Sequence, residues 1–189
     1  MDGTASLGLY GLGTMGAALA LNILDHGFPL HLANRTAARV PRFLAEAGPL
    51  AARATGHESL AAMAAAMPPP RAVILMVDAG PAVDEAIEVL LPVLAPGATV
   101  VDCGNADFHD TRRRAAAVEG RGLAHLGVGV SGGEEGARHG PAIMGGGPAE
   151  AAGGPGDQGE SGVEGKGLGH LRKLVWRSAA PGPRSPSVG

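Results

Sequence analysis

Residues 6–36 read SLGLYGLGTMGAALALNILDHGFPLHLANRT. A short apolar run meets three glycines, a helix-patterned segment follows, and a second apolar run ends at Asn-Arg-Thr. This order is typical of a βαβ unit that holds a dinucleotide. The segment therefore predicts an α/β fold with a nucleotide site near its start.

The glycine spacing alone is weak evidence, because 32 of the 189 residues are glycine. The spacing G-x-G-x-x-G occurs three times, starting at Gly11, Gly127 and Gly154. Only the copy formed by Gly11, Gly13 and Gly16 lies between an apolar strand candidate and an uninterrupted helix candidate. Because phosphate binding requires that context, we select the first copy.

Each glycine of this copy has a physical role. Gly11 allows a tight turn out of the strand, Gly13 lacks the Cβ that would block a pyrophosphate, and Gly16 lets the helix lie close to the sheet. The unpaired amides at the start of the helix can then face the phosphates. The alternative is a glycine turn without any ligand. The predicted cofactor loop comprises Gly11, Leu12, Gly13, Thr14, Met15 and Gly16.

The residues after the second apolar run indicate which dinucleotide binds. An NAD site usually has Asp or Glu about twenty residues after the glycines, where it holds the ribose 2′-hydroxyl. This chain has Asn34, Arg35 and Thr36 there, and a guanidinium can pair with a 2′-phosphate in a forked contact. NADP is therefore the predicted cofactor. Asn34 and Thr36 could instead be helix caps, but that interpretation leaves Arg35 unexplained.

Composition excludes several classes of function. The formal charge of −3 and a pI near 6.1 give no electrostatic case for nucleic acid or an anionic membrane. The first residues lack a signal-peptide pattern, and apolar runs such as AVILMV are too short to cross a bilayer. We expect a soluble protein of the cytoplasm, and we assign no metal ligand. The sole cysteine, Cys103, is either a buried small hydrophobe or a nucleophile.

Apolar runs and helix-patterned segments alternate along the rest of the first 150 residues. The expected strands are 72–77, 98–103 and 123–130, and 51–56 is either a connection or a short strand. The expected helices are 36–48, 60–67, 80–94 and 111–122, the second capped by Ser59 and the last by Asp110. This alternation predicts a Rossmann-like, doubly wound, mainly parallel sheet with helices on both faces.

Ligands of such sheets bind beyond the carboxyl ends of the strands. Three stretches follow the expected strand ends: Val77–Gly80, Asp102–Asn105 and Ser131–Pro141. The last one places Ser131 before two glycines whose exposed amides could hold a substrate carboxylate or hydroxyl. A solvated turn explains the same residues equally well.

The motifs GLGTMG, NRT, VDAG, DCGN and GVSGGEEGARHGP resemble, in this order, the amino-terminal domain of the 6-phosphogluconate dehydrogenase family. The resemblance covers about residues 7–147. It implies NADP as cofactor and 6-phosphogluconate as substrate. The cofactor residues that it adds to the loop and to Asn34, Arg35 and Thr36 are Val77, Asp78, Ala79 and Asn105, and the substrate residues are Asn105, Ser131, Gly132 and Gly133.

This chain departs from the family at two of these turns. Family members often have lysine or glutamine at the position of Asp78, whose negative charge is expected to weaken the cofactor. Cys103 replaces the first glycine of a G-G-N motif, which changes packing more than chemistry.

The family mechanism implies a lysine that takes the proton of the substrate 3-hydroxyl while hydride passes to NADP. Loss of carbon dioxide follows, and a glutamate protonates the enediol to give ribulose 5-phosphate. Lys173 falls on the position of this base, although an isolated lysine is more often a surface residue. Trp176 and Arg177 replace a substrate-binding His-Asn pair, and Ala180 replaces the glutamate. We therefore expect cofactor binding with little turnover.

The chain divides into an NADP-binding domain at 1–150 and a tail at 151–189. The tail is rich in glycine, proline and serine, so we expect it to be mostly disordered, with 167–175 as a remnant that resembles the start of the catalytic helix. The all-helical carboxyl-terminal domain of the family has no counterpart here, which implies an uncovered apolar face that could mediate association. A 3-hydroxyisobutyrate dehydrogenase-like reductase and a non-catalytic NADPH-binding module are the alternatives.

Overall fold

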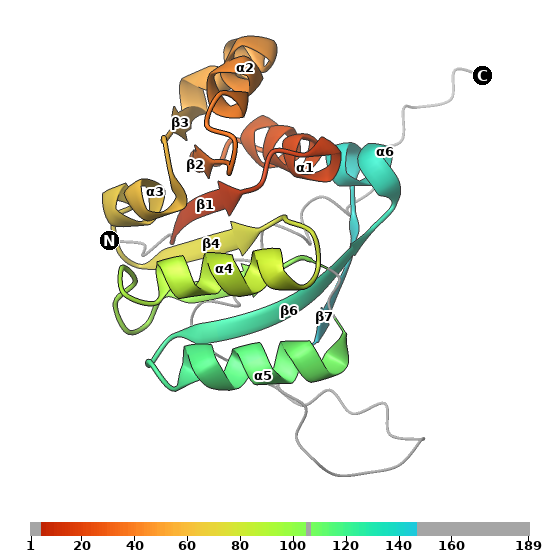
Figure 1. Cartoon of the computed structure of the whole chain (residues 1–189). Coiled ribbons are helices and arrows are strands. Elements are labelled where there is room, and N and C mark those ends of the chain that lie inside the picture. The colour runs from red at the N-terminus through yellow and green to blue at the C-terminus, as the bar shows by residue number, and fades with distance from the viewer. Residues whose placement is uncertain (1–4, 105–106, 147–189) are drawn as a thin grey trace, which may run out of the picture.

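The computed structural model describes residues 5–104 and 107–146. They contain one seven-stranded sheet with helices around it (Figure 1). The strands are β1 Ser6–Tyr10, β2 Leu30–Ala33, β3 Ala54–Gly56, β4 Arg71–Leu75, β5 Thr99–Asp102, β6 Ala124–Ser131 and β7 Ala142–Gly146. Their order is β3-β2-β1-β4-β5-β6-β7. Strands β1 to β6 run parallel and β7 pairs with β6 antiparallel. The predicted Rossmann-like, mainly parallel sheet is confirmed.

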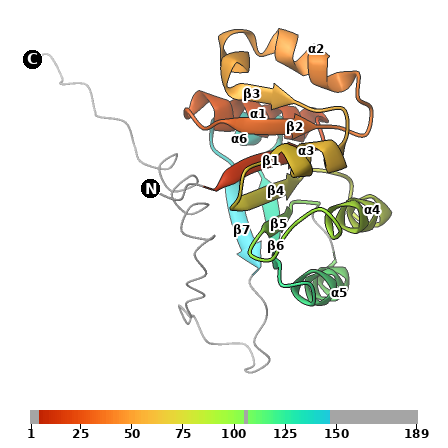
Figure 2. The same ribbon diagram turned by 90° about the vertical axis from the view of Figure 1, so that its left-hand side faces the viewer.

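Helices cover both faces of this sheet. The helices are α1 Thr14–Asp25, α2 Arg39–Glu46, α3 Leu60–Ala66, α4 Pro81–Leu90, α5 Phe108–Glu119 and α6 Gly133–His139, with a 3-10 helix at Gly48–Arg53. One core cluster contains buried residues of α1, α2 and α6, and the other contains buried residues of α3, α4 and α5. Figure 2 shows α3, α4 and α5 together on one side of the sheet.

The central strands explain why the apolar runs lack polar alternation. Leu9 and Leu32 are fully buried in the first cluster, and Val73 and Leu75 are fully buried in the second. A strand that is covered on both faces is apolar at nearly every position. Among the described residues, the large hydrophobic side chains that remain exposed are Val89 and Phe108.

Several expected element boundaries hold and one cap was wrong. Ser59 caps α3, because its Oγ accepts a hydrogen bond from the Ala62 amide at 3.1 Å. Asp110 does not cap α5. The cap is Asp107, whose Oδ1 accepts from the His109 amide at 2.8 Å, while Asp110 lies in the first turn. The two aspartates are three positions apart, so both fit the cap pattern and only the backbone geometry distinguishes them.

The predicted helix at 36–48 is shorter and is followed by a 3-10 turn, and the one at 80–94 ends at Leu90. The ambiguous segment 51–56 includes the short edge strand β3. Neither α6 nor β7 was expected from the sequence. Helix α6 begins at Gly133, the last of the predicted substrate residues 131–133.

His125 on β6 is a buried polar side chain that costs stability. It is 7% exposed, and its Nε2 has no hydrogen-bond partner among the described residues. Burial lowers the pKa of His125, with Asp102 and Glu119 opposing that shift and Arg114 adding to it. The folded protein therefore binds this proton less readily than the unfolded chain does.

We expect His125→Phe to raise the free energy of unfolding by about 1 kcal/mol at pH 8, because the unpaired polar atom is removed. The gain should grow as the pH falls below about 6.5, where histidine in the unfolded chain becomes protonated and favours unfolding of the wild type. Urea unfolding between pH 5 and pH 8 measures the difference. An equal pH slope for wild type and H125F would contradict the assignment.

Candidate site at the carboxyl edge of the sheet

The parallel register brings the predicted site segments to one edge of the sheet. Tyr10 pairs with Ala33 on one side and with Leu75 on the other, and Leu75 pairs with Asp102. Four strands therefore end at one level, and each is followed by a segment that the sequence singled out. Segments that are distant in the sequence meet here because parallel strands share a carboxyl edge.

The glycine loop leaves the end of β1 and enters α1. Gly11 has a φ of +108°, and a Cβ added there would overlap the carbonyl oxygen of Met76. A Cβ on Gly16 would overlap the carbonyl oxygen of Gly11, so helix and loop touch backbone to backbone. A Cβ on Gly13, in contrast, would meet nothing within 4 Å. The loop is therefore tightly packed against backbone at Gly11 and Gly16, and there is open space beside Gly13.

The start of α1 can accept an anion. Gly13 is its N-cap residue, and within the described part of the chain no side chain caps it and no acidic residue lies in the first turn. Thr14 is exposed, and Met15 is half-buried. Free amides at the positive end of a helix dipole favour a phosphate or carboxylate.

Asn34 supports the loop from the end of β2. Its side chain is 9% exposed; its Oδ1 accepts from the Leu12 amide at 2.8 Å and its Nδ2 donates to the Thr36 carbonyl at 3.0 Å. Both ends of this amide are therefore committed to the protein. Asn34 thus joins the end of β2 to the glycine loop, and its predicted cofactor contact stays a prediction.

Arg39 makes a second contact to the loop that the sequence did not single out. Its Nη1 donates to the carbonyl of Leu12 at 3.1 Å. Arg39 lies four residues after Arg35, at the start of α2. A second arginine four positions after Arg35 was the signal available in the sequence.

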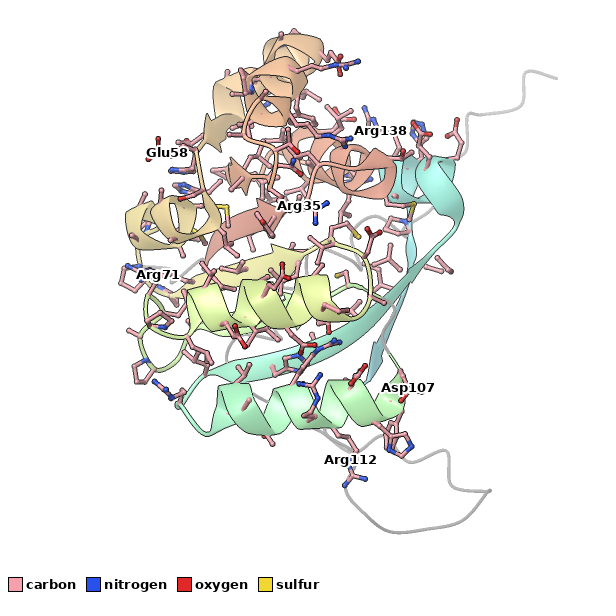
Figure 3. The ribbon with its side chains drawn as sticks, in the orientation of Figure 1. Arg35, Glu58, Arg71, Asp107, Arg112 and Arg138 are labelled. Atoms are coloured by element: carbon pink, nitrogen blue, oxygen red, sulfur yellow. The ribbon has the colours of Figure 1, made fainter. Side chains whose placement is uncertain are left out.

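Arg35 is exposed directly beyond β2, as is Thr36. Figure 3 shows Arg35 beyond the end of β1. Burial raises the pKa of Tyr10, the last residue of β1, and the positive charge of Arg35 opposes that shift. The charge of Arg35 therefore acts at the strand ends.

The turns after β4 and β5 border the same edge. Val77 is half-buried, while Asp78 and Ala79 are exposed ahead of the α4 N-cap at Gly80. Cys103 is 8% exposed, and burial, with Asp102 adding to it, raises the pKa of its thiol to about 12. A thiol that stays protonated is no nucleophile, so Cys103 is a small buried hydrophobe.

Ser131 and its glycines lie beyond the level of the other strand ends. Gly127 of β6 pairs with Asp102, and Ser131 follows four residues later at the end of β6. Ser131, Gly132 and Gly133 are exposed, and both glycines have positive φ, at 109° and 62°. Figure 1 shows β6 continuing to α6, which lies beside α1. The long strand thus carries this segment over the edge.

The segment after Ser131 forms helix α6, which neither the substrate-site nor the solvated-turn interpretation of the sequence included. Helix α6 has Glu134 and Glu135 in its first turn and Arg138 and His139 in its last. This distribution complements the helix dipole and was the signal missed in the sequence. The glycines masked it because glycine has low helix propensity.

Helix α6 is fixed to α1 by polar contacts. The Nδ2 of Asn22 donates to the Arg138 carbonyl at 2.7 Å, and Arg138 pairs with Asp25 at 3.1 Å (Figure 3). A groove of about 560 Å³ between α1, α2 and α6 is lined by Thr14 and Glu134 near the edge and by Phe43 at α2. Thr14 is the residue that this groove shares with the predicted cofactor loop.

Some predicted residues lie outside the residues that the structure describes. These are Asn105, Lys173, the remnant 167–175 and the rest of the tail from 151 to 189. In residues 5–104 and 107–146, no three His, Cys, Asp or Glu side chains gather as metal ligands. No helix in the same ranges is both long and apolar enough to cross a membrane.

Comparison with known proteins identifies relatives with the same domain. The model of the NAD binding domain of 6-phosphogluconate dehydrogenase matches residues 6–153. The decarboxylating 6-phosphogluconate dehydrogenase of Haemophilus influenzae is 43% identical over 188 residues, covering 93% of this chain and 39% of that protein. The human enzyme is 45% identical over 147 residues, covering 78% of this chain and 30% of that protein. The chain thus spans about a third of the length of these relatives.

Solved structures of related enzymes have a similar fold. The Plasmodium falciparum 6-phosphogluconate dehydrogenase, solved in its apo form, with NADP+ and with 6-phosphogluconate, has a TM-score of 0.77 at 31% identity, over 96% of this chain and 36% of that one. The 3-hydroxyisobutyrate dehydrogenase of Mycobacterium tuberculosis has a TM-score of 0.69 at 22% identity, over 93% of this chain and 52% of that one, which shows a common fold. On the match of the domain model and of the sequence relatives, the chain belongs to the family of 6-phosphogluconate dehydrogenase NAD-binding domains.

Proposed function

We propose that this chain binds NADP at the carboxyl edge of the sheet and is the cofactor domain of a phosphogluconate dehydrogenase-type oxidoreductase. The observation that carries the proposal is the cradle at Gly13, which is open where a Cβ would point and closed beneath, at the uncapped start of α1. Such a cradle fits a pyrophosphate. When bound, NADP supplies the hydride acceptor.

The residues proposed to hold the cofactor follow the ends of four strands, β1, β2, β4 and β5. The loop Gly11–Gly16 faces the pyrophosphate through its amides, and the Arg35 guanidinium with the Thr36 hydroxyl holds the 2′-phosphate. Asn34 orients the loop through its contact with Leu12. The turn Val77–Ala79 and Asn105 border the rest of the cofactor. Asp78 is exposed in that turn and lowers the affinity by repelling phosphate charge.

For the substrate we propose 6-phosphogluconate, held by Ser131, Gly132, Gly133 and Asn105, with Lys173 as the base. Support comes from the exposed hydroxyl and left-handed glycines at the end of β6. Trp176, Arg177 and Ala180 stand where the family resemblance implies substrate-binding and proton-donating groups. Catalysis requires all of these groups in fixed geometry, so we infer that this chain alone has little turnover.

Titration with NADPH and NADH, followed by nicotinamide fluorescence, tests the proposal. We expect NADPH to bind at least about tenfold more tightly, which is about 1.4 kcal/mol. A steady-state assay with 6-phosphogluconate and NADP forms the second arm, in which we expect rates far below the typical range of about 1 to 1,000 per second. Absence of NADPH binding would refute cofactor binding, and an ordinary turnover rate would refute the second inference.

A non-catalytic NADPH-binding module is the second candidate, and Ala180 at the glutamate position favours it. Competition by 6-phosphogluconate separates the candidates, because a pure cofactor module or a 3-hydroxyisobutyrate dehydrogenase-like reductase should not bind a phosphorylated sugar acid. We propose that the chain acts in the cytoplasm. Association through the face that a helical domain would cover remains a further prediction, and light scattering would detect it.

A further inference from the structure

Arg114 is a buried arginine on α5 whose side chain contacts Asp102 at the carboxyl end of β5 and Gly80 at the start of α4. Its side chain is 1% exposed, whereas its neighbour Arg113 is 58% exposed. A buried guanidinium is costly unless most of its donors are paired. The partners of Arg114 therefore indicate what it does.

One group of partners belongs to the start of α4. The Nε and Nη2 of Arg114 donate to the two carboxylate oxygens of Asp84 at 2.9 and 3.2 Å, and Nη2 also donates to the carbonyl of Gly80 at 2.9 Å. Gly80 is the α4 N-cap, has a φ of 98° and directly follows the turn Val77–Ala79. Arg114 thus anchors the carboxyl end of that turn.

The other partner belongs to the end of β5. Nη1 of Arg114 donates to Oδ2 of Asp102 at 3.3 Å, and the Asp102 carboxyl is 2% exposed. The other oxygen of Asp102 accepts from the Gly104 amide at 2.9 Å. A single carboxylate therefore connects Arg114 to the turn that leads from Asp102 into Asn105.

The hydrogen bonds from Arg114 lower the pKa of Asp84 to about 2, so the pair stays charged throughout the neutral range. Arg113 adds a contact to Asp84 at 3.0 Å and one to Asp110 at 3.1 Å. The guanidinium of Arg114, on α5, thus donates hydrogen bonds to Asp84 and Gly80 at α4 and to Asp102 on β5. A lysine, with its compact ammonium on a flexible stem, cannot span the same acceptors.

We propose that Arg114 is a positioning residue that holds the turns Val77–Gly80 and Asp102–Gly104 in register for the cofactor. The inference rests on the proposed function, in which both turns border NADP. Arg114 touches neither cofactor nor substrate. It acts through Gly80 on one turn and through Asp102 and Gly104 on the other.

The test compares Arg114→Lys with Val118→Ala in the full chain. Val118 lies one turn later on α5, is fully buried in the cluster shared with α4, and contacts neither turn through a hydrogen bond. Urea unfolding measures how much stability each variant loses. NADPH titration at 25 °C, with folding checked by circular dichroism, measures cofactor affinity. Amide hydrogen exchange at Gly104 reports the turn directly.

We expect R114K to bind NADPH about tenfold more weakly and to lose protection at Gly104, while V118A binds as the wild type does despite its lower stability. If R114K is not folded, Asp84→Asn, at a partly exposed position of the same network, should weaken binding about threefold. Wild-type affinity in R114K, or an equal loss in V118A, would overturn the inference. If the wild type itself does not bind NADPH, the proposed function fails, and the exchange at Gly104 alone decides whether Arg114 positions the turn.

Discussion

Replacing Gly16 with alanine is expected to cost about 3 kcal/mol of stability, the largest loss that we predict for a single methyl group in this protein. The new Cβ would overlap the carbonyl oxygen of Gly11, a backbone atom that no rotamer change can move away. Either α1 must move off the sheet or the turn at Gly11 must open. Urea unfolding followed by circular dichroism measures the loss.

Gly13→Ala is the matched control, since it adds the same methyl group three residues earlier in the same loop. Gly13 has an ordinary φ of −72° and open space around its missing Cβ, so the stability should change by less than about 0.5 kcal/mol. NADPH affinity should nevertheless fall at least about tenfold, because the methyl group would occupy the space proposed for the pyrophosphate. A stable G16A, or a G13A with full NADPH affinity, would contradict the cradle.

The second large effect concerns the choice between cofactors. Arg35→Ala should weaken NADPH binding roughly 10- to 100-fold, because a charge-assisted contact to a phosphate contributes about 1.5 to 3 kcal/mol. NADH affinity should stay within about twofold of the wild-type value, since NADH has no 2′-phosphate for this guanidinium. Fluorescence titration of both cofactors gives the ratio.

Arg121→Ala provides the control for net charge. Arg121 is exposed and follows α5 at the opposite edge of the sheet, where β6 begins. Its removal changes the charge of the protein equally but should leave the NADPH-to-NADH ratio unaltered at physiological ionic strength. An R35A variant that loses affinity for both cofactors in equal measure would show that Arg35 supports the loop and does not select the phosphate.

The sequence allowed much of the fold to be predicted because its main signals are local. The glycine loop could be selected from three copies by its flanking segments, and the apolar run 72–77 indicated the buried strand β4, which spans Arg71–Leu75 in the structure. Helix α6 and strand β7 were missed for the same reason: their segments are rich in glycine, and local propensity then argues against regular structure. Pairing with β6 and packing against α1 overcome that propensity.

For the predicted site, too, local signals could be recognised in the sequence and tertiary contacts could not. Glycine spacing and the residue types Asn-Arg-Thr indicated a dinucleotide site, because a missing Cβ and a guanidinium are properties of single residues. The sequence could not show that the Asn34 side chain is committed to Leu12 and Thr36, or that Arg39 reaches the Leu12 carbonyl. Those contacts depend on how two strands end side by side.

For this protein, the order of apolar runs, glycines and charged residues was sufficient by itself to determine the fold class, and it predicts the cofactor loop and NADP as the cofactor. Tertiary structure alone decided which polar side chains are exposed and which form hydrogen bonds or ion pairs inside the protein. Asp102 and Arg114 stand twelve positions apart in the sequence, yet Nη1 of Arg114 and Oδ2 of Asp102 lie 3.3 Å apart in the structure. Residue type and spacing act along the chain, whereas a buried ion pair exists only after the sheet and its helices have packed.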